Sequence, residues 1–178
     1  MPILGPGAYQ ATDPAECEKR VAEMVKAGCR LIDAAQCCGN GEAVGAGIKN
    51  CGAPREELLI TAKVWFHRCE SGDCRKFVLE SMQKLGADYL DMVLLRWTFG
   101  NTYAAWRDLE ALREEGKIRA IGVSKFDPDR LIDFLHLNKV CPALDQIETH
   151  LLCRRKDERK WMEEYGVAHQ ADALGGSI

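Results

Sequence analysis

The fold of this chain is decided by residues 31–39, which read LIDAAQCCG. They begin as an apolar strand, reach an acid at Asp33 and end in a loop of small residues. Strands of a parallel sheet are buried on both faces, so a carboxylate near the end of one is costly unless it is paired or used. Lys63 stands in the same way after the apolar run 58–62. We therefore predict that Asp33 and Lys63 meet at one rim of a strand-and-helix barrel, the rim that carries the chemistry in such folds.

The rest of the chain repeats one unit: a short apolar run, a turn, an amphipathic helix and a glycine. The apolar runs that we predict as strands are residues 2–9, 30–34, 58–65, 89–95, 118–123, 143–148 and 167–171. Strands that alternate with helices at a spacing of roughly 25 to 30 residues indicate right-handed strand-helix-strand units and a parallel sheet.

Helix boundaries are marked by local chemistry. Asp13-Pro14 and Asp127-Pro128 each place a capping acid before a proline at the first helical position. Glycines should end the helices, because glycine accepts the left-handed conformation that closes a helix. These glycines are Gly28, Gly52, Gly86, Gly116 and Gly166.

Two α/β folds satisfy this alternation, an open doubly wound sheet and a closed barrel. The barrel is favoured by polar residues at successive strand ends, namely Asp33, Lys63, Arg96, Ser124 and Gln146. An open dinucleotide-binding sheet should carry a glycine fingerprint after its first strand; Gly5 and Gly7 begin one, but Gln10 stands where the third glycine belongs. A full barrel of this type typically has about 250 residues. We therefore predict one domain over residues 1–178, a C-terminally truncated (β/α)8 TIM-type barrel of about six to seven βα units.

Composition excludes several function classes. With 178 residues, 47% of them hydrophobic and 29% charged, the chain is long enough for one globular core. Its net charge of -3 lacks the basic footprint of a nucleic-acid-binding protein. The N-terminus lacks the pattern of a secretory signal and no segment approaches the length of a membrane span, so we expect no membrane association and a cytoplasmic location.

The cysteines and histidines give no clear metal site. Nine cysteines form an odd count without framework spacing, which favours reduced thiols. His67, Cys69 and Cys74 crowd one predicted loop, but no second ligand pair follows at zinc-site spacing, so we predict a plain loop and no metal.

Six segments together carry a specific resemblance. They are LGPGAYQ (4–10), LIDAAQ followed by GN (31–36 and 39–40), PREELLITAKVW (54–65), LGADYLDMVLL (85–95), EGKIRAIGVSKFDPDRL (115–131) and QIETH (146–150). In these segments the chain resembles the N-terminal two-thirds of an aldo-keto reductase. The resemblance implies an eight-stranded barrel, NADPH stretched across its C-terminal rim, and hydride transfer between the cofactor and a small carbonyl or alcohol substrate.

The resemblance also implies roles for individual residues. Of the family's catalytic Asp, Tyr, Lys and His, Asp33 matches the acid and Lys63 the lysine. Cys38 stands where the family has its proton-donating tyrosine, and Arg96 where it has histidine. The remaining matches are Ser124 and Gln146, which correspond to residues that hold the nicotinamide carboxamide, and Tyr9 and Trp65, which correspond to aromatics near the substrate mouth.

The departures affect the expected activity. A thiol can give a proton, but the Cys38 sulfur would end on the order of 4 Å short of a phenolic oxygen. General acid catalysis needs hydrogen-bond contact, directly or through one water. Lys125 and Asp145 replace asparagines, and Asp172 replaces the aromatic under the nicotinamide ring. We therefore expect weak NADPH binding and impaired reduction.

Two alternatives stay open. Cations at Lys63 and Arg96 would favour a thiolate at Cys38, so the Cys37-Cys38 pair could instead be a reactive thiol site or simply inert. The chain could also be a non-catalytic remnant or binding module that self-associates through the unpaired strand edges of an incomplete barrel.

Overall fold

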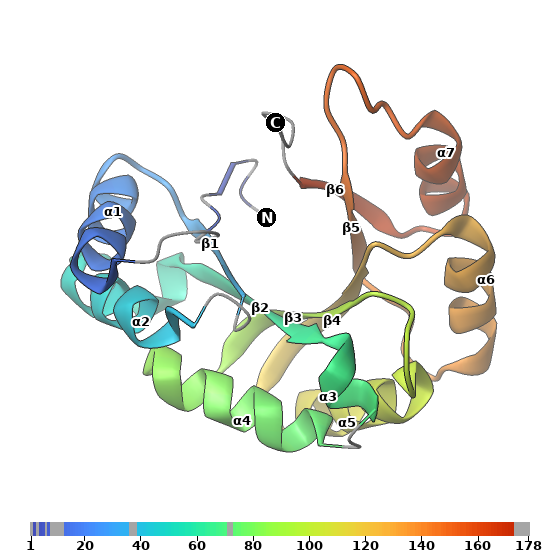
Figure 1. Cartoon of the computed structure of the whole chain (residues 1–178), viewed down its shortest axis with the longest axis horizontal. Coiled ribbons are helices and arrows are strands. Elements are labelled where there is room, and N and C mark those ends of the chain that lie inside the picture. Colours follow the sequence, from blue (N-terminus) through green and yellow to red (C-terminus); the bar gives the residue numbers. More distant parts are fainter. Residues whose placement is uncertain are drawn as a thin grey trace.

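The chain forms one sheet of six parallel strands that curls into an open half-barrel with helices on its convex side (Figure 1). The computed structural model describes residues 2, 4, 5, 7, 13–35, 39–70 and 73–172. The strands lie in chain order and are β1 (Leu31–Ala35), β2 (Leu59–Trp65), β3 (Leu90–Arg96), β4 (Ile118–Ser124), β5 (Leu144–Glu148) and β6 (Ala168–Asp172). This confirms a parallel α/β barrel architecture with sequential strands.

The helices are α1 (Pro14–Lys26), α2 (Gly41–Asn50), α3 (Phe66–Glu70), α4 (Cys74–Leu85), α5 (Thr102–Glu114), α6 (Pro128–Leu137) and α7 (Lys156–Glu164), with a 3-10 turn, η2 (Arg55–Glu57). Within the described ranges, no helix is both long and apolar enough to cross a membrane.

The predicted helix starts differ in detail. The Asp13 carboxylate accepts hydrogen bonds from the backbone N–H groups of Ala15, at 2.9 Å, and Glu16, at 3.4 Å, which confirms it as the cap of α1. Asp127 precedes α6 as predicted, but its side chain makes no capping hydrogen bond. Gly86 ends α4 with φ of 63°, the left-handed conformation that glycine adopts without strain.

The predicted loop at residues 67–74 needs correction, and the predicted strand at residues 2–9 is only partly described. The loop predicted to hold His67, Cys69 and Cys74 is largely helical: the first two lie on α3, and Cys74 begins α4. Cys69 and Cys74 are buried, and no metal-binding group of three or more suitable side chains occurs in the described part of the chain. Of the first predicted strand, residues 2–9, four positions are described, and Gly7 makes a single parallel bridge to Asp33.

The sheet separates two apolar clusters. The large one lies between sheet and helices and includes Trp106 and Phe134. The small one comes from the opposite, concave face and contains Met92, Leu94 and Leu144. At Gly122 on β4, a Cβ would lie 2.8 Å from the Leu144 carbonyl oxygen and 2.9 Å from Leu94, so only glycine fits there without displacement. The concave face is thus apolar in its middle, which leaves its polar residues at the strand ends.

The opposite rim of the sheet, at the N-terminal ends of the strands, is fixed by Asp91. This buried carboxylate pairs with Arg55 at 2.8 Å and Arg119 at 3.0 Å, and it accepts a hydrogen bond from the Ile60 backbone N–H at 3.0 Å. Both guanidinium groups also lie over the Tyr89 ring, at 4.0 and 4.1 Å from its centroid. We interpret this network as stabilising the fold, because the active sites of barrel enzymes lie at the rim formed by the C-terminal ends of the strands.

One buried acid in the sheet has no such partners. Asp145 on β5 is fully buried, and neither of its carboxylate oxygens makes a well-formed hydrogen bond to a described residue, although the backbone amides of Lys125 and Phe126 lie close to it. Burial raises the pKa of this carboxyl to about 7; the charge of Asp127 adds to the shift, while the backbone amides of Phe126 and Lys125 oppose it. The ionised form of Asp145 therefore destabilises the folded chain.

The cost of this buried charge predicts that Asp145→Asn stabilises the folded chain by an amount that depends on pH. The pKa of Asp145 is higher in the folded chain than in the unfolded chain. Below about pH 4 the carboxyl is protonated in both states, so it does not lower the stability of the wild type. As the pH rises to about 7 the wild type loses stability, and above pH 7 the full loss remains. Three pKa units correspond to up to about 4 kcal/mol, so we expect the variant to gain stability toward that limit at pH 8 and almost nothing at pH 4. Urea unfolding across this range measures it. The exposed Asp88→Asn is the matched control, and a gain that does not change with pH would contradict the assignment.

Candidate active site

A buried ion pair lies at the concave face of the sheet, as the sequence predicts. The Lys63 ammonium lies 2.7 Å from Asp33 Oδ2, and the two side chains are 7% and 12% exposed. Gln146, from β5, donates its Nε2–H to the same carboxylate oxygen at 2.9 Å. Side chains from β1, β2 and β5 are therefore joined, although Asp33 and Gln146 are 113 residues apart in sequence.

Next to this pair, the strand register aligns one row of side chains. Trp65 pairs with Arg96, Arg96 with Ser124, Ser124 with Gln146, and Gln146 with Gln170. Residues in register on neighbouring parallel strands point to the same face. The row therefore crosses the concave face from β2 to β6 and contains four of the predicted site residues.

Many polar atoms on this face are buried and have no hydrogen-bond partner among the described residues. They are Asp33 Oδ1, Thr61 Oγ1, Arg96 Nε, Ser124 Oγ, Gln146 Oε1 and Gln170 Oε1. Such an atom costs about 1 to 3 kcal/mol, and native proteins contain few of them. Their concentration on one face fits a site whose ligand supplies the missing partners.

Ser124 and Gln146 fit an amide ligand in particular. Ser124 is fully buried and Gln146 is 1% exposed. The Ser124 hydroxyl can donate to an amide oxygen, while Gln146 Oε1 can accept from an amide NH2, because its own NH2 is already held by Asp33. These two residues therefore suit the carboxamide of a nicotinamide.

Two cations on this rim stack on aromatic rings. The Arg96 guanidinium lies 5.0 Å from the Trp65 ring centroid, and the Lys125 ammonium lies 5.0 Å from that of Trp97. Trp97 and Lys125 follow β3 and β4 directly and have left-handed backbones, with φ of 72° and 62°. Backbone strain of this kind is common at functional sites.

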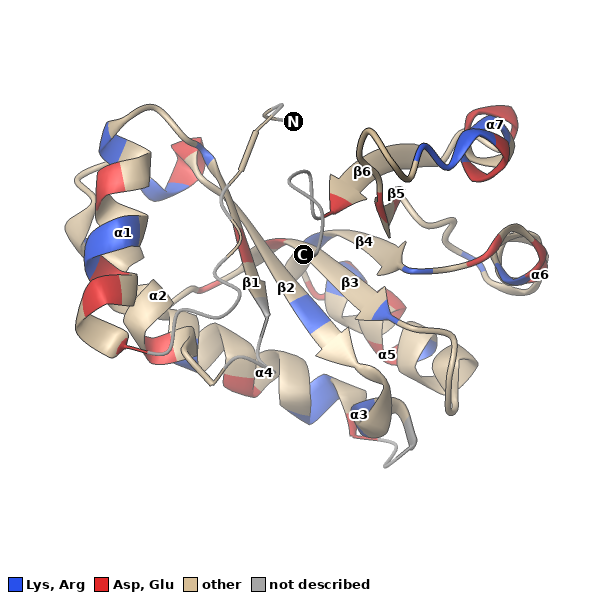
Figure 2. Ribbon diagram, turned by 45° about the horizontal axis from the view of Figure 1, so that its top comes forward, with Lys and Arg blue, Asp and Glu red and all other residues tan. Residues whose placement is uncertain are grey.

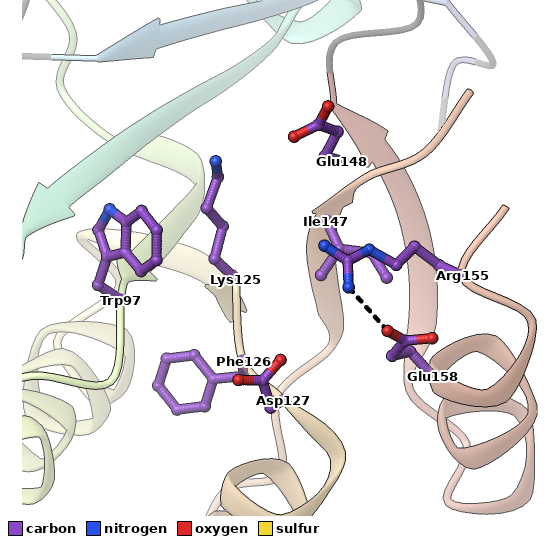
Figure 3. Close-up of a pocket in the computed structure, with 8 residues that line it drawn as sticks. All are labelled: Trp97, Lys125, Phe126, Asp127, Ile147, Glu148, Arg155 and Glu158. Carbon is purple, nitrogen blue, oxygen red and sulfur yellow. Dashed lines mark hydrogen bonds and ion pairs between the residues drawn. The ribbon is translucent and has the colours of Figure 1, made fainter. Parts of the chain in front are cut away.

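A pocket of about 220 Å³ opens beside the row, between the segments that follow β4 and β5 (Figure 3). Lys125 and Glu148 extend toward the same opening, and Arg155, which also lines the pocket, pairs with Glu158 at 2.9 Å. Sequence reasoning missed Trp97, Arg155 and Glu158 as neighbours of the site. No sequence signal marks Trp97 and Arg155, because their left-handed backbones depend on tertiary contacts, and Glu158 is recognised only through its ion pair with Arg155.

The structure thus brings together six of the eight predicted site residues: Asp33, Lys63, Trp65, Arg96, Ser124 and Gln146. The other two, Tyr9 and Cys38, lie outside the described residues, as does Cys37. Asp172 ends β6 in register with Glu148.

Comparison with known proteins gives one consistent result. The model of the aldo/keto reductase family matches residues 3–170. The chain is 36% identical over 180 residues to 9,11-endoperoxide prostaglandin H2 reductase of Trypanosoma cruzi, covering 99% of this chain and 63% of that protein. It is 37% identical over 172 residues to glyoxal reductase of Bacillus subtilis, covering 96% and 62%.

Solved structures agree. An aldo-keto reductase from a Medee basin deep-sea metagenome library superposes with a TM-score of 0.92 at 32% identity, over 96% of this chain and 63% of that one. A Bombyx mori aldo-keto reductase in complex with NADP superposes with a TM-score of 0.94 at 25% identity, over 100% and 64%. The chain therefore spans somewhat less than two thirds of the length of these relatives. By its family match and by the barrel strands that carry its buried Asp33–Lys63 pair, the chain belongs to the aldo-keto reductase family.

Proposed function

We propose that this chain binds NADPH and reduces small carbonyl compounds, with much lower activity than a family member that carries tyrosine and histidine at the positions of Cys38 and Arg96. The observation that carries the proposal is the buried Lys63–Asp33 pair with Gln146 bound to it, beside the unpartnered Ser124 hydroxyl. The NADP complex of the silkworm relative supports the choice of cofactor.

We assign a separate role in carbonyl reduction to each residue of the site. When bound, NADPH supplies the hydride that becomes attached to the carbonyl carbon. Ser124 and Gln146 orient the carboxamide through the hydroxyl and Oε1 that lack partners. Trp65 closes one side of the substrate mouth, and the Arg96 guanidinium donates to the carbonyl oxygen on which negative charge develops. We place Tyr9 at the same mouth by family resemblance.

Proton donation to the carbonyl oxygen is the step that we expect to be slow in this chain. A proton must reach the carbonyl oxygen to give the alcohol, and the Lys63 ammonium, which Asp33 holds in place, can stabilise the negative charge left on a neighbouring donor. At the position of Cys38 the donor is too short for direct contact and has to act through a water. General acid catalysis contributes about 100- to 10,000-fold, so we expect a loss of that order.

The substrate class and location follow from the family and remain part of the proposal. The name of the Bacillus subtilis relative, glyoxal reductase, makes glyoxal a suitable test substrate. We propose a cytoplasmic location, where NADPH is available.

A second candidate function is a non-catalytic binding module that self-associates. It is favoured by one observation: in the described part of the chain, β6 pairs with β5 alone, so its other edge is open. Open strand edges invite pairing with another chain.

Restoring the family's residues tests the main proposal. The double variant Cys38→Tyr, Arg96→His should oxidise NADPH with glyoxal at least about 100-fold faster than the parent, because it regains a proton donor of full reach. Loss of NADPH absorbance measures the rate. Adding the charge-balanced pair Asp33→Asn, Lys63→Met should remove the gain, whereas the exposed Lys117→Met should not.

Each part of this proposal has its own contrary outcome. If the parent already matched the restored variant, the claim of impairment would be wrong. If the restored variant showed no NADPH-dependent turnover, the claim of reductase activity would be wrong.

The second candidate is tested by size-exclusion chromatography with light scattering. The reductase proposal expects a monomer near the chain mass of 19.9 kDa that stays monomeric when NADPH is added. The binding-module candidate expects a dimer or larger species at micromolar concentration. A monomer over the whole concentration range removes the second candidate.

A further inference from the structure

Charges separate along the rim at the C-terminal ends of the strands. Lysine and arginine lie toward the ends of β2 and β3 and just past β4, whereas acids end β5 and β6 (Figure 2). The basic residues are Lys63, Arg96 and Lys125, and the acidic ones are Glu148 and Asp172. A ligand across this rim therefore meets opposite charges on its two sides.

The two sides differ in how their charges are partnered. Lys63 is neutralised by Asp33, and Glu148 is bound by His150 at 3.0 Å. Arg96 and Lys125, by contrast, form no ion pair with any described residue, and their charged groups lie near the rings of Trp65 and Trp97. Arg96 and Lys125 are therefore the cations of this rim for which a ligand could supply a counter-charge.

Arg96 is held in a way that suits an anion. Its guanidinium lies near Trp65, and a stacked guanidinium can still donate from its edges. Its Nε is buried without a partner, and the side chain as a whole is half-buried. A partly desolvated cation without a counter-charge is costly, whereas a carboxylate can accept two parallel hydrogen bonds from such an edge.

The distance from Arg96 to the ion pair limits the ligand further. Lys63 pairs in register with Leu94, so Arg96 is one strand across and two residues further along β3. Strand spacing and rise place the Cα atoms of Lys63 and Arg96 about 8 Å apart. Arg96 therefore lies on the strand next to Lys63 and on the same face of the sheet.

We infer that Arg96 is a specificity-determining residue that selects 2-oxo carboxylates: besides donating to the carbonyl oxygen, its guanidinium pairs with the carboxylate on the adjacent carbon. This inference rests on the proposed carbonyl reduction for the identity of the reacting group. The preference is local, because the chain's net charge of -3 does not attract anions at long range.

A binding experiment tests this without requiring turnover. The probes are oxamate, an unreactive mimic of a 2-oxo carboxylate, and oxamide, its neutral isostere, each titrated into the full chain with NADPH present and absent. Isothermal titration calorimetry gives the affinities. We expect oxamate to bind about 10- to 100-fold more tightly than oxamide, the range given by charge-assisted hydrogen bonds.

Variants separate the role of Arg96 from general charge effects. Arg96→Met should lose the oxamate preference, so that the two probes bind with similar affinity, while Arg96→Lys should retain part of the preference, because it keeps the charge without the planar fork. The matched control is Arg107→Met, an equal charge change on the exposed face of α5, which should bind both probes like the wild type.

The outcomes are distinct from those of the reductase test. Equal affinity for oxamate and oxamide in the wild type, or no oxamate binding in either cofactor condition, would overturn the inference without any variant having to fold. An oxamate preference that Arg96→Met leaves intact would also overturn it. Oxamate binding that depends on Arg96 in a chain without reductase activity would uphold this site and reject the proposed function alone.

Discussion

The buried ion pair between Lys63 and Asp33 is the interaction on which the rest of the site depends. Neither charge could remain on the concave face alone, because an unpaired buried charge costs several kcal/mol. Their pairing requires the ends of β1 and β2 to stay adjacent, and the hydrogen bond from Gln146 adds β5 to the same carboxylate. The curl of the sheet is what brings β5 back toward β1, so the geometry of the site and the curvature of the half-barrel support one another.

Local chemistry made much of the fold predictable. The Asp13 cap and the left-handed Gly86 depend on neighbours in sequence, and both occur where residue type indicates. The pairing of Asp33 with Lys63 was predictable because each is a charge at the end of an apolar run. The side chain of Asp127, which does not cap α6, shows that the same motif can have different contacts in a different tertiary setting.

Other features could not be read from the sequence. The hydrogen bond from Gln146 to Asp33 spans most of the chain and depends on how far the sheet curls. The backbones of Trp97, Lys125 and Arg155 adopt a conformation that their residue types disfavour, so only the tertiary structure identifies them. Helix α3 is a single short turn that replaces a predicted loop. Cys38, on which the expected impairment depends, is assigned by resemblance alone.

The described part of the site divides into two functions. One part of the site is polar and suits a nicotinamide. It contains Ser124, Gln146 and the Asp33–Lys63 pair, and some of its buried polar atoms have no described hydrogen-bond partner. Arg96 adds a permanent charge where the resemblance implies a histidine, and we propose that this charge shifts the site from simple aldehydes toward anionic substrates. This position thus gives a physical basis for the selectivity that we propose.

The central claim, that this concave rim is a nicotinamide site, is tested most directly by calorimetric titration of the chain with NADPH. The account predicts saturable binding of one NADPH per chain that becomes weaker in both Ser124→Ala and Gln146→Ala but not in the exposed Lys117→Met. Absence of saturable binding, or binding that neither rim variant weakens, would contradict it.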